Sequence, residues 1–345
     1  ALAKLSQEGV ENLIIDLRGN LGGFLNSAYQ MANEFLPKGR LIVYTQGRKS
    51  PRQEYRSDGR GSYQQIPLIV LIDETSASAS EIFAGAMQDN DRATIIGRRS
   101  FGKGLVQQPI PFNDNSMIRL TIARYYTPSG RCIQKPYTMG DEKSYEEDIL
   151  VRYQHGEFFS QDSIKHSGKV YHTSIGRKVY GGGGITPDIF IPEDTLNVTS
   201  YYKEASMSGL ILQFAFTYTD NNRLKLNNFS EMQELADYLV KQNTVEKFAD
   251  YANKNGLKRR NLMIKKSHKL LERYINSRII YNMLNDEAWT EYLNQDDPAI
   301  MKSLDVFKRK AAFPKKGSKN MQTSMVGMDA LPMMNTGKKW VACFG

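Results

Sequence analysis

The sequence lacks the features of disulfide-rich, membrane-spanning and signal-peptide-bearing chains. Only two of its 345 residues are cysteines, Cys132 and Cys343, which lie far apart and are too few for a disulfide framework. No run of about 18 apolar residues occurs, which argues against a membrane-spanning helix in this sequence. A basic region followed by an apolar stretch, typical of a signal peptide, is also missing from the N-terminus. The two cysteines leave the compartment undecided.

The chain begins at Ala1 without a methionine. Residues 1–10 are typical of a helix that leads directly into a strand. We therefore expect the sequence to be a fragment whose upstream part is missing.

The net charge of +9 is unevenly distributed. Residues 201–345 hold 23 of the 46 basic residues and 15 of the 37 acidic residues, which leaves 23 basic and 22 acidic residues in residues 1–200. The basic residues of the second part occur in helical patterns broken by acids, not in an aromatic-spaced stripe. Nucleic acid is therefore not an expected partner.

Short apolar runs alternate with helical patterns in the first part of the chain. Residues 24–36 and 79–88 have helical spacing, and the first of these ends at Pro37 and Gly39. Such alternation predicts a layered α/β fold. The segments expected to form strands are residues 12–16, 41–45, 53–55, 68–72, 94–97, 105–109 and 117–123.

Residues 1–195 are expected to form this core, interrupted by an excursion at about 131–184 that is rich in Tyr, Lys, Asp and Gly. The excursion is either a surface insertion or a flexible connector. Residues 196–313 are expected to form a helical region, in which Ser230 and Gln233 match a capping box. Residues 314–345 lack periodicity and are expected to be disordered.

A serine on a turn before a helix and a lysine between glycines are the residues that indicate chemistry. Ser76, Ser78 and Ser80 follow the apolar run 68–72, and a serine there needs a base and oxyanion donors to act as a nucleophile. No histidine lies near this segment, so Lys103 is the candidate base. The four histidines are His155, His166, His172 and His268.

Lys103 can accept a proton only in its neutral form, so its surroundings must disfavour the ammonium. Phe101, Leu105 and Val106 supply apolar neighbours, and Gln107 could hold the amine by a hydrogen bond. The N–H of Ala79, at the start of the helix, is a candidate oxyanion donor.

Plainer interpretations of the same residues stay open at this point. A Ser/Ala run before a helix is a common cap with small residues for close packing. A lysine between glycines is a common solvated loop residue, and the spacing does not match a phosphate-binding loop.

Five segments of the chain form a combined motif. In order, they are Asp16–Gly23, Thr75–Glu81 with Ile82, Ala84 and Gly85, Ile96–Gly97 with Phe101–Gly104 and Gln107, Tyr125–Arg131, and Gly184–Asp188. Together they resemble the carboxyl-terminal processing, or tail-specific, proteases of the S41 serine peptidase family. The excursion and the helical extension are similar to those of the Bacteroidetes-type members.

The resemblance implies a role for individual residues. Ser78, the middle serine of the run, corresponds to the nucleophile, Lys103 to the general base and Gln107 to the residue that positions it. The oxyanion hole corresponds to the N–H of Ala79 with that of Gly22 or Gly23. Glu81 matches an acidic position that could orient the site.

The resemblance also implies a ClpP/crotonase-like fold and cleavage of polypeptides near their C-termini through an acyl-enzyme, without a metal or organic cofactor. Family members commonly have a PDZ domain upstream of the first segment, and we expect that domain to lie before the start of this sequence. A periplasmic or envelope location, with a membrane tether in the missing part, is expected from the family alone. The alternatives are a catalytically silent peptide-binding scaffold and a crotonase-like acyl-processing enzyme.

Overall fold

The computed structural model describes residues 2–138, 140–166, 169–315 and 342–344. The chain forms two compact units, Ala1–Glu193 together with Lys302–Gly345, and Asp194–Met301. The sequence predicts a core that ends at residue 195 and a helical region over residues 196–313. In the structure, the segment that begins at Lys302 belongs to the first unit, where Thr94 Oγ1 donates to the carbonyl of Ala312 (2.9 Å).

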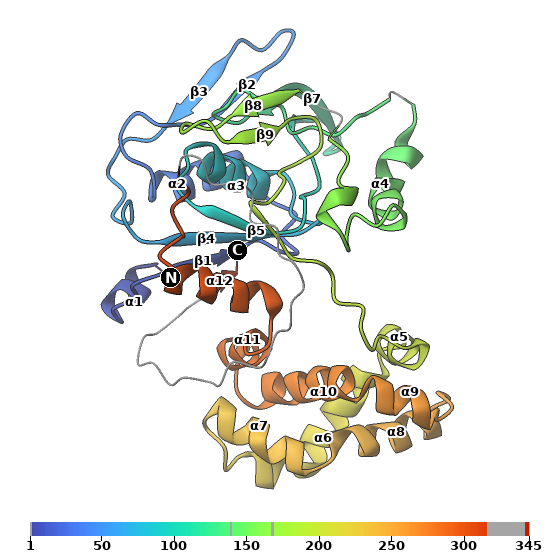
Figure 1. The fold of residues 1–345 in the computed structure, drawn as a ribbon. Coiled ribbons are helices and arrows are strands. Elements are labelled where there is room, and N and C mark those ends of the chain that lie inside the picture. Colours follow the sequence, from blue (N-terminus) through green and yellow to red (C-terminus); the bar gives the residue numbers. More distant parts are fainter. Residues whose placement is uncertain (1, 139, 167–168, 316–341, 345) are drawn as a thin grey trace. The chain divides into compact units, whose positions relative to one another are not determined.

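The first unit has three layers, with two helices between two sheets (Figure 1). One sheet is parallel, with the strand order β10-β5-β4-β1-β11. Its strands are β1 (Leu13–Asp16), β4 (Leu68–Ile72), β5 (Thr94–Gly97), β10 (Ile189–Phe190) and β11 (Ala342–Phe344).

The other sheet is antiparallel, with the order β3-β2-β7-β6. Its strands are β2 (Leu41–Gln46), β3 (Gln53–Arg56), β6 (Leu105–Pro111) and β7 (Met117–Tyr126), and a separate hairpin is formed by β8 (Val170–His172) and β9 (Lys178–Tyr180).

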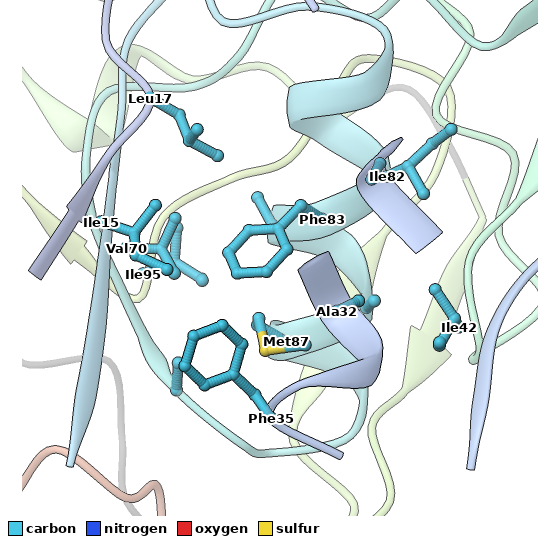
Figure 2. Close-up of a cluster of buried hydrophobic side chains, with 14 of the residues drawn as sticks. Ile15, Leu17, Ala32, Phe35, Ile42, Val70, Ile82, Phe83, Met87 and Ile95 are labelled. Carbon is cyan, nitrogen blue, oxygen red and sulfur yellow. The ribbon is translucent and has the colours of Figure 1, made fainter. Parts of the chain in front are cut away.

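Helix α3 (Ala79–Asp89) lies at the centre of this unit, beside α2 (Leu25–Asn33). Phe83 and Met87 of α3 pack against Phe35 and against the inner side of the parallel sheet (Figure 2). All residues of β4 and α3 are buried, so a continuous apolar run forms the central strand and an apolar helix covers it. The structure confirms the predicted layered α/β core.

Three further helical segments belong wholly or in part to this unit. They are α1 (Leu2–Gln7), α4 (Glu142–Gln154) and the end of α12 (Pro298–Lys308), besides a 3₁₀ turn at Gln161–Ser163. Most of the predicted tail, residues 316–341, lies outside the described residues, so its expected disorder is untested. Residues 342–344, however, pair with β1 as a strand.

The second unit is helical and has its own buried core. Its core includes Leu235, Leu239, Phe248 and Ile275. The predicted capping box at Ser230 is wrong, because α7 begins at Met232 with Glu231 as its N-cap. The helices are α5 (Ser200–Met207), α6 (Leu210–Leu226), α7 (Met232–Lys241), α8 (Thr244–Lys254), α9 (Asn261–Lys266), α10 (His268–Met283) and α11 (Asp286–Asn294).

None of the helices in the described ranges is both long and apolar enough to cross a membrane.

Candidate active site

The candidate site lies where β1 and β4 end. The two strands are parallel neighbours, so the loop after β1 and the turn after β4 meet at one edge of the sheet. Ala77 N–H donates to the carbonyl of Asn20 (3.1 Å), and Gly19 N–H donates to the carboxylate of Asp73 (3.2 Å). These bonds hold the glycine loop against the serine turn.

The three candidate serines have different environments. Ser76 is fully buried, and its hydroxyl donates to the carbonyl of Leu17 (2.7 Å). The hydroxyl of Ser80 donates to the side chain of Asn20 (2.9 Å). Ser78 alone of the three is half-buried, and it has a left-handed backbone with φ 58°. Strained positive-φ residues cluster at functional sites, so the geometry favours Ser78 among the three.

Glu81 connects the serine turn to the lysine segment. Its carboxylate is fully buried and accepts hydrogen bonds from Ser78 N–H (3.0 Å) and Lys103 N–H (2.8 Å) through Oε2. Through Oε1 it accepts from Gly102 N–H (2.7 Å) and from the Ser100 hydroxyl (2.5 Å). Burial raises the pKa of Glu81, and the four hydrogen bonds oppose that rise. One side chain thus fixes the distance between the two segments.

Lys103 and Gln107 are less enclosed than the sequence predicts. Lys103 is half-buried and Gln107 is exposed. Gln107 lies on β6 opposite Thr121, next to a register shift. Within the described residues, neither the Lys103 ammonium nor the Gln107 amide forms a hydrogen bond with Ser78 Oγ. The structure therefore brings the Ser78 and Lys103 backbones together but not their functional atoms.

Among the oxyanion candidates, Gly22 lies directly against the serine turn. The backbone of Gly22 has φ 91° and lies so close to the turn that a Cβ there would be 2.4 Å from Ala77 O and 2.7 Å from Ala79 N. Gly22 N–H is already bonded to Asn20 Oδ1 (2.8 Å). No backbone acceptor for Ala79 N–H or Gly23 N–H occurs among the described residues, so these two donors are the ones open to a substrate oxygen.

Tyr125 is a site residue that the sequence analysis did not single out. Its hydroxyl lies 3.0 Å from Ser78 Oγ, and either oxygen can be the donor. Burial raises the pKa of Tyr125 to about 12, so the phenol stays neutral. Tyr125 is in the fourth of the five segments, but nothing in the sequence indicates that its side chain faces a serine 47 residues away.

The segment after Arg131 supports the lysine loop from behind. Gln134 Oε1 accepts from Gly104 N–H (2.8 Å), and Lys135 N–H donates to Gly102 O (2.9 Å). The buried Lys135 ammonium lies 4.0 Å and 4.1 Å from the ring centroids of Phe101 and Tyr145, and it donates to Tyr145 O (2.7 Å).

Tyr145 belongs to α4, within the predicted excursion. The excursion is therefore not a flexible connector, because its residues contact the loop that holds Lys103.

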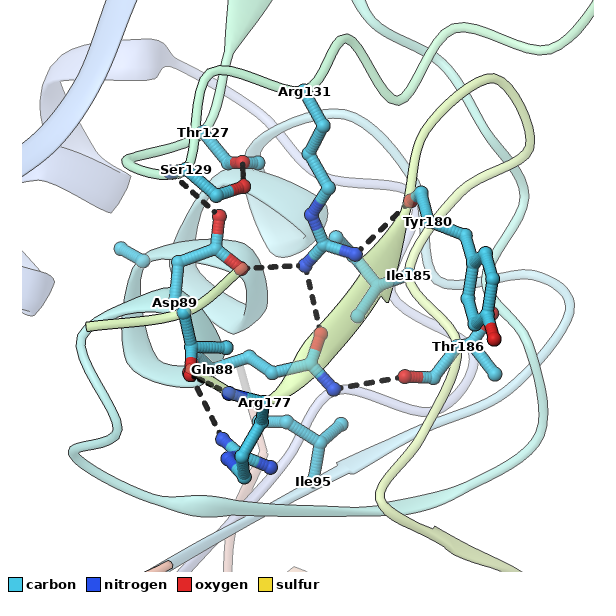
Figure 3. Close-up of polar contacts among 12 residues, drawn as sticks. Gln88, Asp89, Ile95, Thr127, Ser129, Arg131, Arg177, Tyr180, Ile185 and Thr186 are labelled. Atoms are coloured by element: carbon cyan, nitrogen blue, oxygen red, sulfur yellow. Dashed lines mark hydrogen bonds and ion pairs between the residues drawn. The ribbon is translucent and has the colours of Figure 1, made fainter. Parts of the chain in front are cut away.

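A buried polar cluster holds the other end of α3 (Figure 3). The Arg131 guanidinium is fully buried and donates to Gln88 Oε1 (2.7 Å), Asp89 Oδ1 (2.7 Å) and Tyr180 O (3.1 Å). Gln88 in turn donates to Thr186 O (2.9 Å). The fourth and fifth segments thus fix the far end of α3, the helix whose N-cap is Ser78.

Two family models match this sequence. Residues 1–144 match the model described as peptidase family S41. Residues 201–285 match a family of unknown function, DUF8443.

Known proteins are similar to parts of the chain. A carboxyl-terminal-processing protease of Synechocystis sp. is 42% identical over 142 residues, 41% of this chain and 33% of that protein. A Staphylococcus epidermidis protein named "Probable CtpA-like serine protease" is 31% identical over 264 residues, 74% of this chain and 48% of that protein. A solved structure, a photosystem II D1 C-terminal processing protease, is 38% identical with a TM-score of 0.36, covering 39% of this chain and 34% of that one. The chain spans about a third to a half of the length of these relatives.

Proposed function

We propose, because residues 1–144 match the model of peptidase family S41, that the chain is a serine endopeptidase that cleaves polypeptides near their C-termini through Ser78 and Lys103. The observation that supports this most is the bridge made by Glu81, which accepts from the backbone N–H groups of both residues. A buried carboxylate that bonds to both segments is well placed to set the geometry of a nucleophile and its base.

The chemistry follows from these positions. Ser78 Oγ attacks the scissile carbonyl carbon while its proton passes to the neutral amine of Lys103. The oxyanion receives hydrogen bonds from Ala79 N–H and a glycine N–H of the first loop, Gly23 or, once released from Asn20, Gly22. Collapse expels the amine product, which takes the proton from Lys103. The same lysine then activates the water that hydrolyses the acyl-enzyme.

Catalysis requires a change at Ser78 in this proposal. In the resting arrangement the Ser78 hydroxyl is bonded to Tyr125. When Ser78 is the donor in this bond, its proton has to turn from Tyr125 to Lys103 before the amine can take it. Gln107 would then hold the amine, as the family resemblance implies, and an envelope location would suit substrates with exposed C-termini.

The test uses an acylating serine probe and an unfolded protein substrate. Ser78→Ala is expected to abolish both labelling and cleavage, and Lys103→Ala to abolish cleavage, while the exposed control residues Ser62 and Lys49 tolerate alanine. Circular dichroism checks that the variants fold. Cleavage of unfolded casein by Ser78→Ala or Lys103→Ala at the parental rate would show that the assignment is wrong.

A catalytically silent scaffold has one observation in its favour, the absence of a Ser78–Lys103 hydrogen bond in the described residues. Labelling of Ser78 in the parental chain separates the two functions, because a silent protein does not react with the probe.

A further inference from the structure

The β6–β7 hairpin extends beyond the sheet to which it belongs. Strand β2 pairs with β7 only from Arg124 to Tyr126, whereas β6 pairs with β7 from Met117 to Arg124. No third strand in the described residues continues the sheet along residues 117–123. Such a two-stranded ribbon is only marginally stable without something packed on it.

One face of this ribbon is apolar and uncovered. Ile118, Leu120 and Ile122 alternate with Arg119 and Thr121, the period-two pattern typical of a strand with one buried face. The register places Ile110 of β6 opposite Ile118. The exposed fractions are 39% for Ile110, 46% for Ile118, 48% for Leu120 and 36% for Ile122. We call these four residues the hairpin face.

The hairpin face starts at the candidate site. Strand β6 begins at Leu105, two residues after Lys103, and β7 reaches Tyr125, whose hydroxyl contacts Ser78 Oγ. Tyr125 N–H also donates to Gly104 O (3.0 Å), which fixes the base of the hairpin to the lysine loop. At about 3.3 Å per residue, the segment from Tyr125 to Ile118 is roughly 23 Å long.

We propose that the hairpin face binds an extended apolar stretch of the polypeptide substrate and leads it to Ser78; this proposal rests on the proposed function. The occupant is an unfolded chain, because folded proteins rarely expose a contiguous apolar stretch of this length. The four side chains are uncharged, so the apolar surface itself supplies the affinity.

A second copy of the chain fits less well. Less than half of each of the four side chains is exposed, so the face offers no more than about 300 Å², whereas a stable interface buries roughly 800 Å² per partner. Pro109 and Pro111 also remove N–H groups from the outer strand β6. Strand pairing between two hairpins is therefore disfavoured.

The experiment measures binding without cleavage. The Ser78→Ala chain is titrated against fluorescein-labelled, reduced and carboxymethylated α-lactalbumin, and fluorescence anisotropy gives Kd. Adding Ile118→Ser and Leu120→Ser is expected to weaken binding at least about tenfold, since each side chain loses apolar burial. Leu120→Asn alone serves as a milder second variant.

Met117→Ser is the matched control, because Met117 is 60% exposed on the opposite face of the same strand. It is expected to change Kd by less than about twofold. Light scattering follows the oligomeric state of every variant.

Three results would overturn the proposal. The double variant could bind as tightly as Ser78→Ala, or Ser78→Ala could fail to bind at all. The third is a dimer of the chain that the double variant dissociates while Kd stays constant. Its failure is distinguishable from failure of the proposed function. Probe labelling of Ser78 in the parental chain tests catalysis, and anisotropy tests docking.

Discussion

Replacing Glu81 by glutamine tests whether one carboxylate sets the site. Glu81 accepts hydrogen bonds from the N–H groups of Ser78, Gly102 and Lys103 and from the Ser100 hydroxyl. A glutamine keeps one acceptor oxygen and turns an amide NH₂ towards two of these donors. Each buried donor left without a partner costs about 1–3 kcal/mol, so the loss of acceptors for two donors in Glu81→Gln is expected to lower the free energy of unfolding by about 2–6 kcal/mol.

The catalytic effect is expected to be larger than the loss of stability alone would produce. A displacement of about 1 Å between nucleophile and base can cost roughly 100-fold in rate, so Ser78 labelling by an acylating probe should slow by at least about that factor. The assay combines urea unfolding with single-turnover labelling, below the denaturant concentration at which any variant unfolds.

Glu74→Gln is the matched control. Glu74 lies in the same turn and pairs with Arg98 (2.7 Å), but it has no hydrogen bond to the Ser78 or Lys103 segment in the described part of the chain. It should lose no more than about 1–2 kcal/mol of stability and keep its labelling rate. If folded Glu81→Gln is labelled as fast as Glu74→Gln, the bridge does not position the site.

Three other substitutions test separate contacts. Tyr125→Phe keeps the buried ring but removes the hydroxyl that competes for Ser78; losing a bond of about 1 kcal/mol should speed labelling roughly fivefold, and a slower rate would mean that Tyr125 assists the reaction. Gly22→Ala places a Cβ 2.4 Å from Ala77 O at φ 91°, whereas Gly23→Ala meets nothing within 4 Å, so thermal unfolding should show destabilisation for the first only; equal Tm values would contradict the close approach. Burial lowers the pKa of Lys135, so between that lowered value and the ordinary value of about 10.5 the unfolded state binds one proton more than the folded state. Urea unfolding should therefore show that the parental chain gains stability relative to Lys135→Met as pH rises from about 7 to about 10. The exposed Lys143→Met should show no such trend.

Local patterns predicted the parallel sheet well. The runs 68–72 and 94–97 are strands with the expected bounds. For 68–72 the reason is that a fully apolar stretch of this length has few other ways to be buried. Ser78 could be chosen among three serines only through the family resemblance. Its left-handed backbone and the bonding of Ser76 and Ser80 became visible in the structure.

Contacts between segments far apart in the chain could not be predicted from the sequence. Tyr125 contacts Ser78, and Lys135 contacts Phe101, only because the fold brings these residues together. The alternation of apolar and polar residues in a strand does not indicate which distant side chain each of them contacts. Ser230 and Gln233 match a capping box by residue type, but the N-cap of α7 is Glu231, one residue later. The excursion contained a helix whose Tyr145 covers Lys135, which its glycine-rich composition concealed.

The cluster around Arg131 has a consequence for the order of events during protein synthesis. Gln88 and Asp188 are 100 residues apart, yet they are hydrogen-bonded (3.0 Å). A ribosome making about 5–20 residues per second needs roughly 5–20 s to add that stretch. For most of this interval the nascent chain contains Ser78, Glu81 and Lys103 but not Asp188, which completes the contacts at the far end of α3. The far end of α3 is therefore fixed only after both the serine turn and the lysine loop have been made, so the long sequence separation delays completion of this part of the fold.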